Sequence, residues 1–189
     1  MGTENPHTLR NDNRRRSRRK PRNVLTDTNN NGQIKERRMA EFTGEPFHIL
    51  LVEDNEAHAE LVIRGMRDLQ VAHIIHHMSD GEQALDYLFQ RGTCTDPQKN
   101  PRPSIVLLDL RLPRVDGLEV LRTIKTAPSL LRIPVVVLTS SDAESDIAQS
   151  YDYHANSYVV KPLDFRSFTK LMKDLGSYWL GWNAKPLAD

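Results

Sequence analysis

Strict alternation between short apolar runs and amphipathic stretches is the feature that most constrains the fold of this chain. The pattern repeats five times, each apolar run being followed by a stretch with apolar residues at helical spacing. The predicted strands are 47–52, 71–78, 105–108, 134–138 and 158–160, and the predicted helices are 56–69, 81–91, 118–125, 143–151 and 165–179. Alternating strand and helix units with right-handed crossovers form a parallel sheet covered on both faces. We therefore predict an α/β fold with a doubly wound, five-stranded parallel sheet.

The first 45 residues differ in composition from the rest of the chain. They contain eleven Lys and Arg against six Asp and Glu, and they show no apolar periodicity. Such a segment cannot bury enough surface to offset the entropy of ordering it. We predict a disordered basic extension over residues 1–45, a folded domain over 46–185 and a short tail over 186–189. The extension carries a formal charge of +5 and the remainder −4, unlike a uniformly basic nucleic-acid binder.

The sequence has no feature of a secreted or membrane protein. The single cysteine, Cys94, excludes an internal disulfide and a multi-cysteine metal site, and we interpret it as an incidental thiol. No apolar stretch approaches the roughly 20 residues needed to span a bilayer. The N-terminus lacks the apolar middle region of a secretory signal. We expect a cytoplasmic protein that does not associate with membranes.

Polar residues follow the predicted strands at their carboxyl ends, where the ligands of parallel α/β sheets bind. They are Glu53, Asp54, Asp109, Thr139 with Ser140, and Lys161. Crowded carboxylates repel one another unless a cation joins them, and Mg²⁺ prefers oxygen ligands of this kind. We predict that Mg²⁺ is bound by Asp54 and Asp109, with Glu53 helping directly or through water. Lys161 would add fixed positive charge.

Asp109, on the central predicted strand, is the best-placed nucleophile among these residues. A carboxylate can attack phosphorus and form an aspartyl phosphate. Phosphoryl transfer depends chiefly on positioning and on neutralising the oxygens of the transferred group. Mg²⁺, Lys161 and the hydroxyl of Thr139 would do so here.

Four segments resemble the receiver-domain motifs of two-component response regulators, in the order and spacing of that family. They are LVEDN at 51–55, LLDLRLPRVDG at 107–117, VLTS at 137–140 and YVVKP at 158–162. The resemblance implies a flavodoxin-like strand order, 2-1-3-4-5, and a sensor histidine kinase as partner. It also implies a phosphorylation switch rather than an enzyme that acts on a separate substrate.

The resemblance also implies roles for individual residues. It matches Asp109 to the phospho-acceptor, Glu53 and Asp54 to the acidic pair of the metal site, Arg111 to the residue whose backbone carbonyl ligates Mg²⁺, Lys161 to the characteristic lysine of the family, and Thr139 and Tyr158 to its switch residues. The bond between Lys161 and Pro162 matches one that is commonly cis, and X–Pro is the context in which cis is readily tolerated.

A closer likeness is to stand-alone regulators paired with bacterial phytochrome kinases. It rests on residues 93–103 and 130–141, on Tyr151-Asp152 and on Tyr178-Trp179. Two residues depart from the family pattern. Arg111 is long and cationic beside the acceptor, where it could shield a phosphoryl group from water, so we predict a long-lived phosphorylated state. His154 stands where many relatives have glycine.

The expected output is through protein contacts, since only residues 181–189 follow the last predicted helix. The family resemblance implies a homodimer through the fourth helix, fifth strand and fifth helix, where Trp179, Leu180 and Trp182 would extend an apolar surface. One alternative is a nucleic-acid-associated regulator whose basic arm, with its run from Arg14 to Lys20, is the output. The other is a phosphorylation-independent adaptor that shares only the fold. We consider nucleic-acid binding the less favoured reading, because no aromatic residues are interleaved with the basic run.

Three histidines, His73, His76 and His77, lie in the second predicted strand. Alternation along a strand places His73 and His77 on one face and His76 on the other. No companion cysteine or carboxylate is in liganding register, so we interpret them as ordinary strand residues.

Overall fold

The computed structural model of the chain describes residues 24–28, 34–38 and 45–184, and the chain divides into two units, Met1–Thr43 and Gly44–Asp189. In the first unit, β1 (Val24–Thr28) and β2 (Ile34–Arg38) pair antiparallel. The sequence predicted no strand in this range, because its mixed polar composition gives only a weak strand pattern. Most of the predicted extension 1–45 and all of the tail 186–189 lie outside the described residues, so the predicted domain limits stay a prediction.

The second unit is built on a five-stranded parallel sheet. Its strands are β3 (Phe47–Val52), β4 (His73–Met78), β5 (Ile105–Leu108), β6 (Val135–Thr139) and β7 (Ser157–Val160). They lie in the order β4-β3-β5-β6-β7, and every neighbouring pair is parallel. Counted within this sheet the order is 2-1-3-4-5, so the predicted fold is confirmed.

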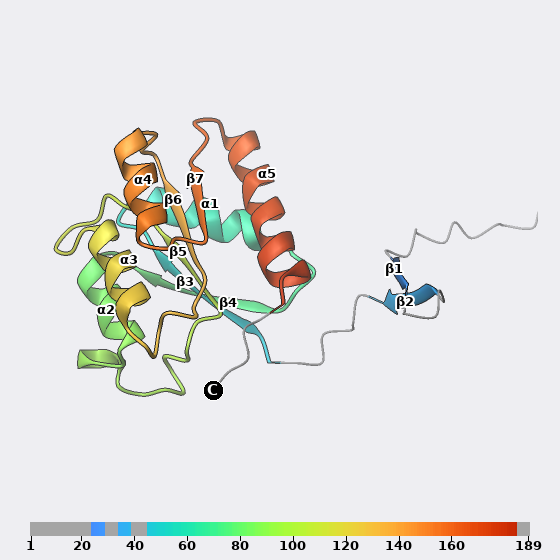
Figure 1. Cartoon of the computed structure of the whole chain (residues 1–189), viewed down its shortest axis with the longest axis horizontal. Helices are drawn as coiled ribbons and strands as arrows, with labels where there is room; N and C mark the ends of the chain where they lie inside the picture. Colours follow the sequence, from blue (N-terminus) through green and yellow to red (C-terminus); the bar gives the residue numbers. More distant parts are fainter. Residues whose placement is uncertain (1–23, 29–33, 39–44, 185–189) are drawn as a thin grey trace, which may run out of the picture. The chain divides into compact units, whose positions relative to one another are not determined.

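Helices cover both faces of the sheet (Figure 1). They are α1 (Glu56–Met66), α2 (Gly81–Leu88), α3 (Gly117–Thr126), α4 (Glu144–Asp152) and α5 (Phe165–Gly176), with a 3₁₀ turn, η1 (Gly92–Cys94), after α2. Helix α1 packs beside α5, and α3 packs beside both α2 and α4. No helix in the described part of the chain is long and apolar enough to cross a bilayer.

Side chains cap four of these five helices at their first turns. Asn55, Asp80, Asp116 and Asp164 each accept a hydrogen bond from a backbone N–H of the helix that follows. Such caps satisfy N–H groups that have no partner within the helix. Helix α4 is different, because Ala143 occupies its cap position and cannot accept such a bond.

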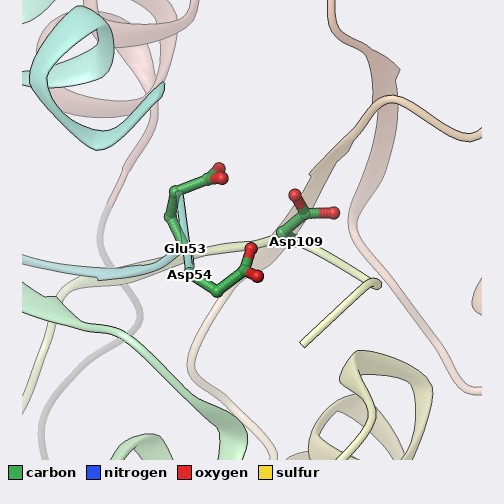
Figure 2. Close-up of side chains that lie close together, drawn as sticks. All are labelled: Glu53, Asp54 and Asp109. Atoms are coloured by element: carbon green, nitrogen blue, oxygen red, sulfur yellow. The ribbon is translucent and has the colours of Figure 1, made fainter. Parts of the chain in front are cut away.

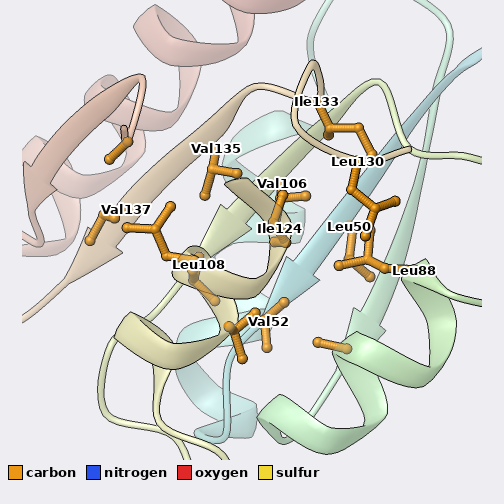
Figure 3. Close-up of a cluster of buried hydrophobic side chains, with 14 of the residues drawn as sticks. Leu50, Val52, Leu88, Val106, Leu108, Ile124, Leu130, Ile133, Val135 and Val137 are labelled. Atoms are coloured by element: carbon orange, nitrogen blue, oxygen red, sulfur yellow. The ribbon is translucent and has the colours of Figure 1, made fainter. Parts of the chain in front are cut away.

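Two hydrophobic clusters fill the space between sheet and helices. Figure 3 shows the one that α2 and α3 cover, in which Leu50, Val106 and Val135 come from three adjacent strands. On the other face, Ile49, Leu107 and Val136 pack with residues of α1 and α5. Successive strand residues point to opposite faces, so strands buried on both sides are apolar at every position. The uninterrupted apolar run of β5 has this cause.

The C-terminal region differs most from its predicted form. The predicted helix 165–179 ends at Gly176 and continues as a π-helix, η2 (Ser177–Trp182). Leu180 is 3 % exposed and belongs to the cluster under α1 and α5, so its predicted place on an apolar surface is wrong. The wider π turn changes which residues face the core. Trp182 is exposed, in agreement with its predicted place on an apolar surface.

Candidate phosphoryl-acceptor site

The acidic residues predicted at the strand exits meet in the structure. Glu53 and Asp54 follow β3 and Asp109 follows β5, and one carboxylate oxygen of each lies within 4.8 Å of the others. Figure 2 shows the three side chains together where their strands end. Glu53 and Asp109 are buried, whereas Asp54 is exposed. Solvent therefore reaches this group from the side of Asp54.

Lys161 joins the two buried carboxylates. Its Nζ donates to Glu53 Oε2 at 2.5 Å and to Asp109 Oδ2 at 2.6 Å. The lysine side chain is only 6 % exposed. A buried ammonium between two buried carboxylates offsets their mutual repulsion, and removing it would leave uncompensated charge in the interior. This side chain crosses from β7 to the ends of β3 and β5.

The donor set fits a hard divalent cation. Three carboxylates and one ammonium leave a net negative charge at the site, and every available ligand atom is oxygen. Mg²⁺ takes one or two carboxylates and keeps several waters, which suits a group with one exposed member. Among the described residues, Glu53, Asp54 and Asp109 form the one group of three or more potential metal ligands. No strand histidine belongs to it.

The turn after β5 holds the acceptor candidate in place. The backbone N–H of Arg111 donates to Asp109 Oδ1 at 3.3 Å, and that of Gly117 donates to the Leu110 carbonyl at 2.9 Å. A Cβ at Gly117 would lie 2.2 Å from the Asp109 carbonyl oxygen, closer than side chains approach. Only glycine therefore lets the first residue of α3 pack against this turn.

Thr139, the predicted switch hydroxyl, is fully buried at the end of β6. Its Oγ1 accepts from the backbone N–H of Ser141 at 3.4 Å. Tyr158 on β7 is half-buried, and its hydroxyl donates to the Ser141 carbonyl at 3.0 Å. Burial is the main cause that raises the pKa of Tyr158. Both predicted switch residues therefore contact the loop between β6 and α4.

Asp146, in the first turn of α4, is a buried residue of this region that the sequence did not single out. Its Oδ2 accepts from Arg111 Nη2 at 2.6 Å and from Ser141 Oγ at 2.5 Å. An acidic residue in the first turn of a helix is common, because it interacts favourably with the helix dipole. Its position in the sequence therefore carried no signal of these contacts.

Histidines line the other side of Glu53. His58 Nδ1 lies 3.3 Å from Glu53 Oε1, and His77 Nε2 lies 2.7 Å from the Glu53 carbonyl oxygen. On the sheet, His48 Nδ1 and His76 Nε2 are 3.0 Å apart, and burial is the main cause that lowers the pKa of His76. These contacts fit the interpretation of the strand histidines as structural residues.

The peptide bond between Lys161 and Pro162 is trans, as are all peptide bonds among the described residues. The expectation of a cis bond, which the family resemblance implied, is wrong for this structure. Trans is the more stable form of an X–Pro bond by about 0.5–1 kcal/mol. With the trans bond, Lys161 reaches both buried carboxylates.

Comparison with known proteins identifies relatives of the whole folded unit. Residues 49–173 match the sequence profile of the response regulator receiver domain. The probable methanogenesis regulatory protein FilR2 of Methanothrix harundinacea is 46 % identical over 142 residues, which cover 75 % of this chain and 89 % of FilR2. Response regulator Rcp1 of Synechocystis is 39 % identical over 150 residues, or 79 % of this chain and all of Rcp1.

Two solved structures agree with the fold. The Mn²⁺-bound form of Rcp1 superposes with a TM-score of 0.71 and 40 % identity, covering 75 % of this chain and all of the other. The phosphorylated cyanobacterial phytochrome response regulator RcpA superposes with a TM-score of 0.72 and 39 % identity, covering 76 % of this chain and all of the other. Neither the adaptor reading nor the nucleic-acid reading is favoured by these relatives.

Proposed function

This chain belongs to the response regulator receiver domain family and is homologous to phytochrome response regulators, and we propose that Asp109 is its phosphoryl acceptor. The observation that carries the proposal is the buried Lys161, whose Nζ contacts Asp109 and Glu53 beside the exposed Asp54. Burying charges of both signs costs free energy even when they are paired, and clusters of this kind are common at functional sites. A purely structural Asp109 would need neither the second carboxylate nor the third.

In the proposed reaction, a carboxylate oxygen of Asp109 attacks the phosphorus of the donor. A new P–O bond forms to Asp109 while the bond from phosphorus to the donor nitrogen or oxygen breaks, and its electron pair leaves with the donor atom. The Nζ of Lys161 already lies 2.6 Å from Asp109 Oδ2, where it can neutralise developing charge on the phosphoryl oxygens. The Thr139 hydroxyl, at the end of the neighbouring strand, can donate to one of them.

The metal ligands in this proposal are Glu53, Asp54, Asp109 and the backbone carbonyl of Arg111. When bound, Mg²⁺ supplies positive charge that stabilises the phosphoryl oxygens. The chain itself orients Asp109 through the Lys161 contact and the Arg111 N–H. Asp54, the exposed member of the group, is the carboxylate that solvent reaches.

The switch in this proposal couples the acceptor to α4 and β7. If the Thr139 hydroxyl moves toward a phosphoryl group on Asp109, the Ser141 N–H loses its acceptor. Tyr158 donates to the carbonyl of the same Ser141. A movement of this loop would break that hydrogen bond and release the Tyr158 side chain to repack. Phosphorylation would thereby bias two arrangements of one loop.

A receiver domain implies a histidine kinase as partner, and we extend this to a phytochrome-type kinase because RcpA is a phytochrome response regulator. A cytoplasmic location follows from the same role.

A homodimer through α4, β7 and α5 is the second part of the proposal. Large apolar side chains are exposed on or next to these elements, namely Tyr151, Val160, Leu163, Phe165, Tyr178 and Trp182. Aromatic residues are enriched at interfaces of this kind.

Light scattering at micromolar protein, with and without acetyl phosphate, should give twice the mass of the chain in at least the phosphorylated state. A monomer under both conditions would exclude the dimer.

Intact-protein mass tests the acceptor. Incubation with acetyl phosphate and Mg²⁺ should add about 80 Da, the mass of one phosphoryl group replacing a proton. The addition should disappear in Asp109→Asn and in the presence of EDTA. Asp86→Asn is the same change at a residue of α2 whose carboxylate pairs with Arg91, and it should behave as wild type. Equal addition in Asp109→Asn would refute Asp109 as the acceptor.

A further inference from the structure

Asp146 is a buried carboxylate that lies outside the motifs shared with the family. It is 8 % exposed, and one of its oxygens, Oδ2, accepts hydrogen bonds from both Arg111 and Ser141. Arg111 contributes a charge-assisted contact at 2.6 Å, the kind of hydrogen bond that is shortest and strongest. Asp146 therefore ties α4 to two separate loops.

Both loops border the proposed phosphoryl position. Arg111 follows the acceptor Asp109 by two residues, and Ser141 follows the switch residue Thr139 by two residues. Their backbones already contact these residues, since the Arg111 N–H donates to Asp109 and the Ser141 N–H donates to Thr139. The loops that Asp146 joins are thus the two that a phosphoryl group on Asp109 would displace.

The Arg111 side chain can change partner. It is 61 % exposed, and among the described residues its guanidinium forms an ion pair with Asp146 alone. A guanidinium binds phosphoryl oxygens in the same forked geometry with which it binds a carboxylate. A doubly charged phosphoryl group on Asp109 and the single charge of Asp146 are then alternative partners for one cation.

We propose that Asp146 is a positioning residue that holds the Arg111 guanidinium away from the acceptor and competes with the phosphoryl group for it. The inference rests on the proposed function, because it concerns the phosphoryl group on Asp109. Arg111 shields that group from water when it is released, so Asp146 shortens the lifetime of the phosphorylated state. Because Asp146 belongs to α4, the release of Arg111 also loosens the first turn of that helix.

A merely structural role for Asp146 predicts something different. Helix α4 lacks a side-chain cap, and Asp146 together with Glu144 stabilises its first turn through the helix dipole. Under that role, any loss of Asp146 would act on α4 whether or not Arg111 is present. The two roles are separated by asking whether the effect of Asp146 requires Arg111.

The test is a double-mutant cycle on phosphate lifetime. Wild type, Asp146→Asn, Arg111→Ala and the double variant are phosphorylated with acetyl phosphate and Mg²⁺, desalted, and followed by intact mass. Asparagine keeps one oxygen that can accept from Ser141, while it removes the charge and replaces the other carboxylate oxygen with an NH₂ group. Glu144→Gln removes the same charge from an exposed residue of the same helix turn and is the matched control.

Asp146→Asn should lengthen the half-life about threefold, the ratio that corresponds to the free energy of one partly exposed ion pair. Arg111→Ala should shorten it, and the double variant should match Arg111→Ala. Glu144→Gln should match wild type. A half-life unchanged or shortened in Asp146→Asn, or lengthened by the same factor without Arg111, would overturn the proposal. A half-life of Arg111→Ala equal to that of wild type would also overturn it. This second variant keeps the proposal testable if Asp146→Asn fails to fold.

Failure of the inference is distinct from failure of the proposed function. Phosphorylated wild type with no effect of Asp146→Asn overturns only the role of Asp146. Wild type that gains no phosphoryl group in the presence of Mg²⁺ overturns the acceptor assignment and the role of Asp146 with it.

Discussion

Two lysines at opposite ends of the parallel sheet show how differently its two edges are built. Lys161, at the carboxyl ends of the strands, lies between the carboxylates of Glu53 and Asp109. Lys125, near the amino ends of β6 and β7, donates to the carbonyl of Ile133 and to Asn156 Oδ1, both at 2.8 Å. One lysine is held by charged groups and the other by neutral acceptors.

The neutral surroundings of Lys125 have a measurable consequence. Burial without a counter-charge lowers its pKa from 10.5 to about 8. Its hydrogen bonds join the loop after α3 to the start of β7, which is a purely structural task. Lys161 instead pairs with the two buried carboxylates of Glu53 and Asp109. The comparison shows a lysine paired with carboxylates at the carboxyl edge and a lysine that joins loops at the amino edge, and the proposed function assigns chemistry to the first.

Loss of Lys161 should have the largest effect on phosphorylation. Lys161→Met should slow the acetyl phosphate reaction by about 100-fold, the usual cost of losing one preorganised electrostatic group. Lys125→Met, the same change at the other edge, should leave the rate within about twofold of wild type, because no interaction of Lys125 reaches the acceptor. Time courses of intact mass give both rates. Equal slowing in the two variants would remove the functional distinction between the edges.

The pH dependence of stability should distinguish the amino edge. The pKa of Lys125 is lower in the folded state than its ordinary value of 10.5, so between about pH 8 and 10.5 the unfolded chain binds more protons. Stability therefore rises with pH in that window on account of this residue. In urea unfolding at pH 7.5 and 10, the stability of wild type relative to Lys125→Met should therefore rise with pH, because the two proteins share every other titrating group. The same slope in both proteins would contradict the lowered pKa.

His154 should give the smallest effect. It lies in the turn between α4 and β7, at the amino edge, with a φ of 63° in the left-handed region. Residues with a Cβ pay about 1–2 kcal/mol to adopt this conformation, and glycine does not. His154→Gly should raise the free energy of unfolding by up to about 1 kcal/mol and leave phosphate lifetime unchanged. Lower stability would mean that the imidazole makes a stabilising interaction of its own.

The centre of the sheet could be predicted from the sequence because β3, β5 and β6 are buried on both faces. The bounds of β3 and β5 agree with the predicted 47–52 and 105–108, since apolar runs end abruptly at Glu53 and Asp109. Helix ends could not be predicted in this way, because hydrophobic spacing does not mark where a helix stops. Leu180 lies beyond the predicted helix 165–179, and its predicted place on an apolar surface follows from the dimer face that the family resemblance implies. The structure instead buries it in a π-helix that hydrophobic spacing does not indicate.

The acidic group could be predicted because parallel topology brings strand exits together. Glu53, Asp54, Asp109, Thr139 and Lys161 all lie at the predicted edge. Contacts that depend on side-chain conformation could not be predicted in this way. Asp146 and Arg111 are 35 residues apart, and only the packing of α4 against the turn after β5 brings them together.

The central claim is that the phosphoryl group resides on Asp109, and the most direct measurement locates it. Wild type treated with acetyl phosphate and Mg²⁺ is reduced with borohydride, which converts an aspartyl phosphate to homoserine, and the peptides are sequenced by mass spectrometry. We predict homoserine at position 109, with unmodified aspartate at position 54. Homoserine at another position, or no homoserine in protein whose intact mass shows a phosphoryl group, would contradict the assignment.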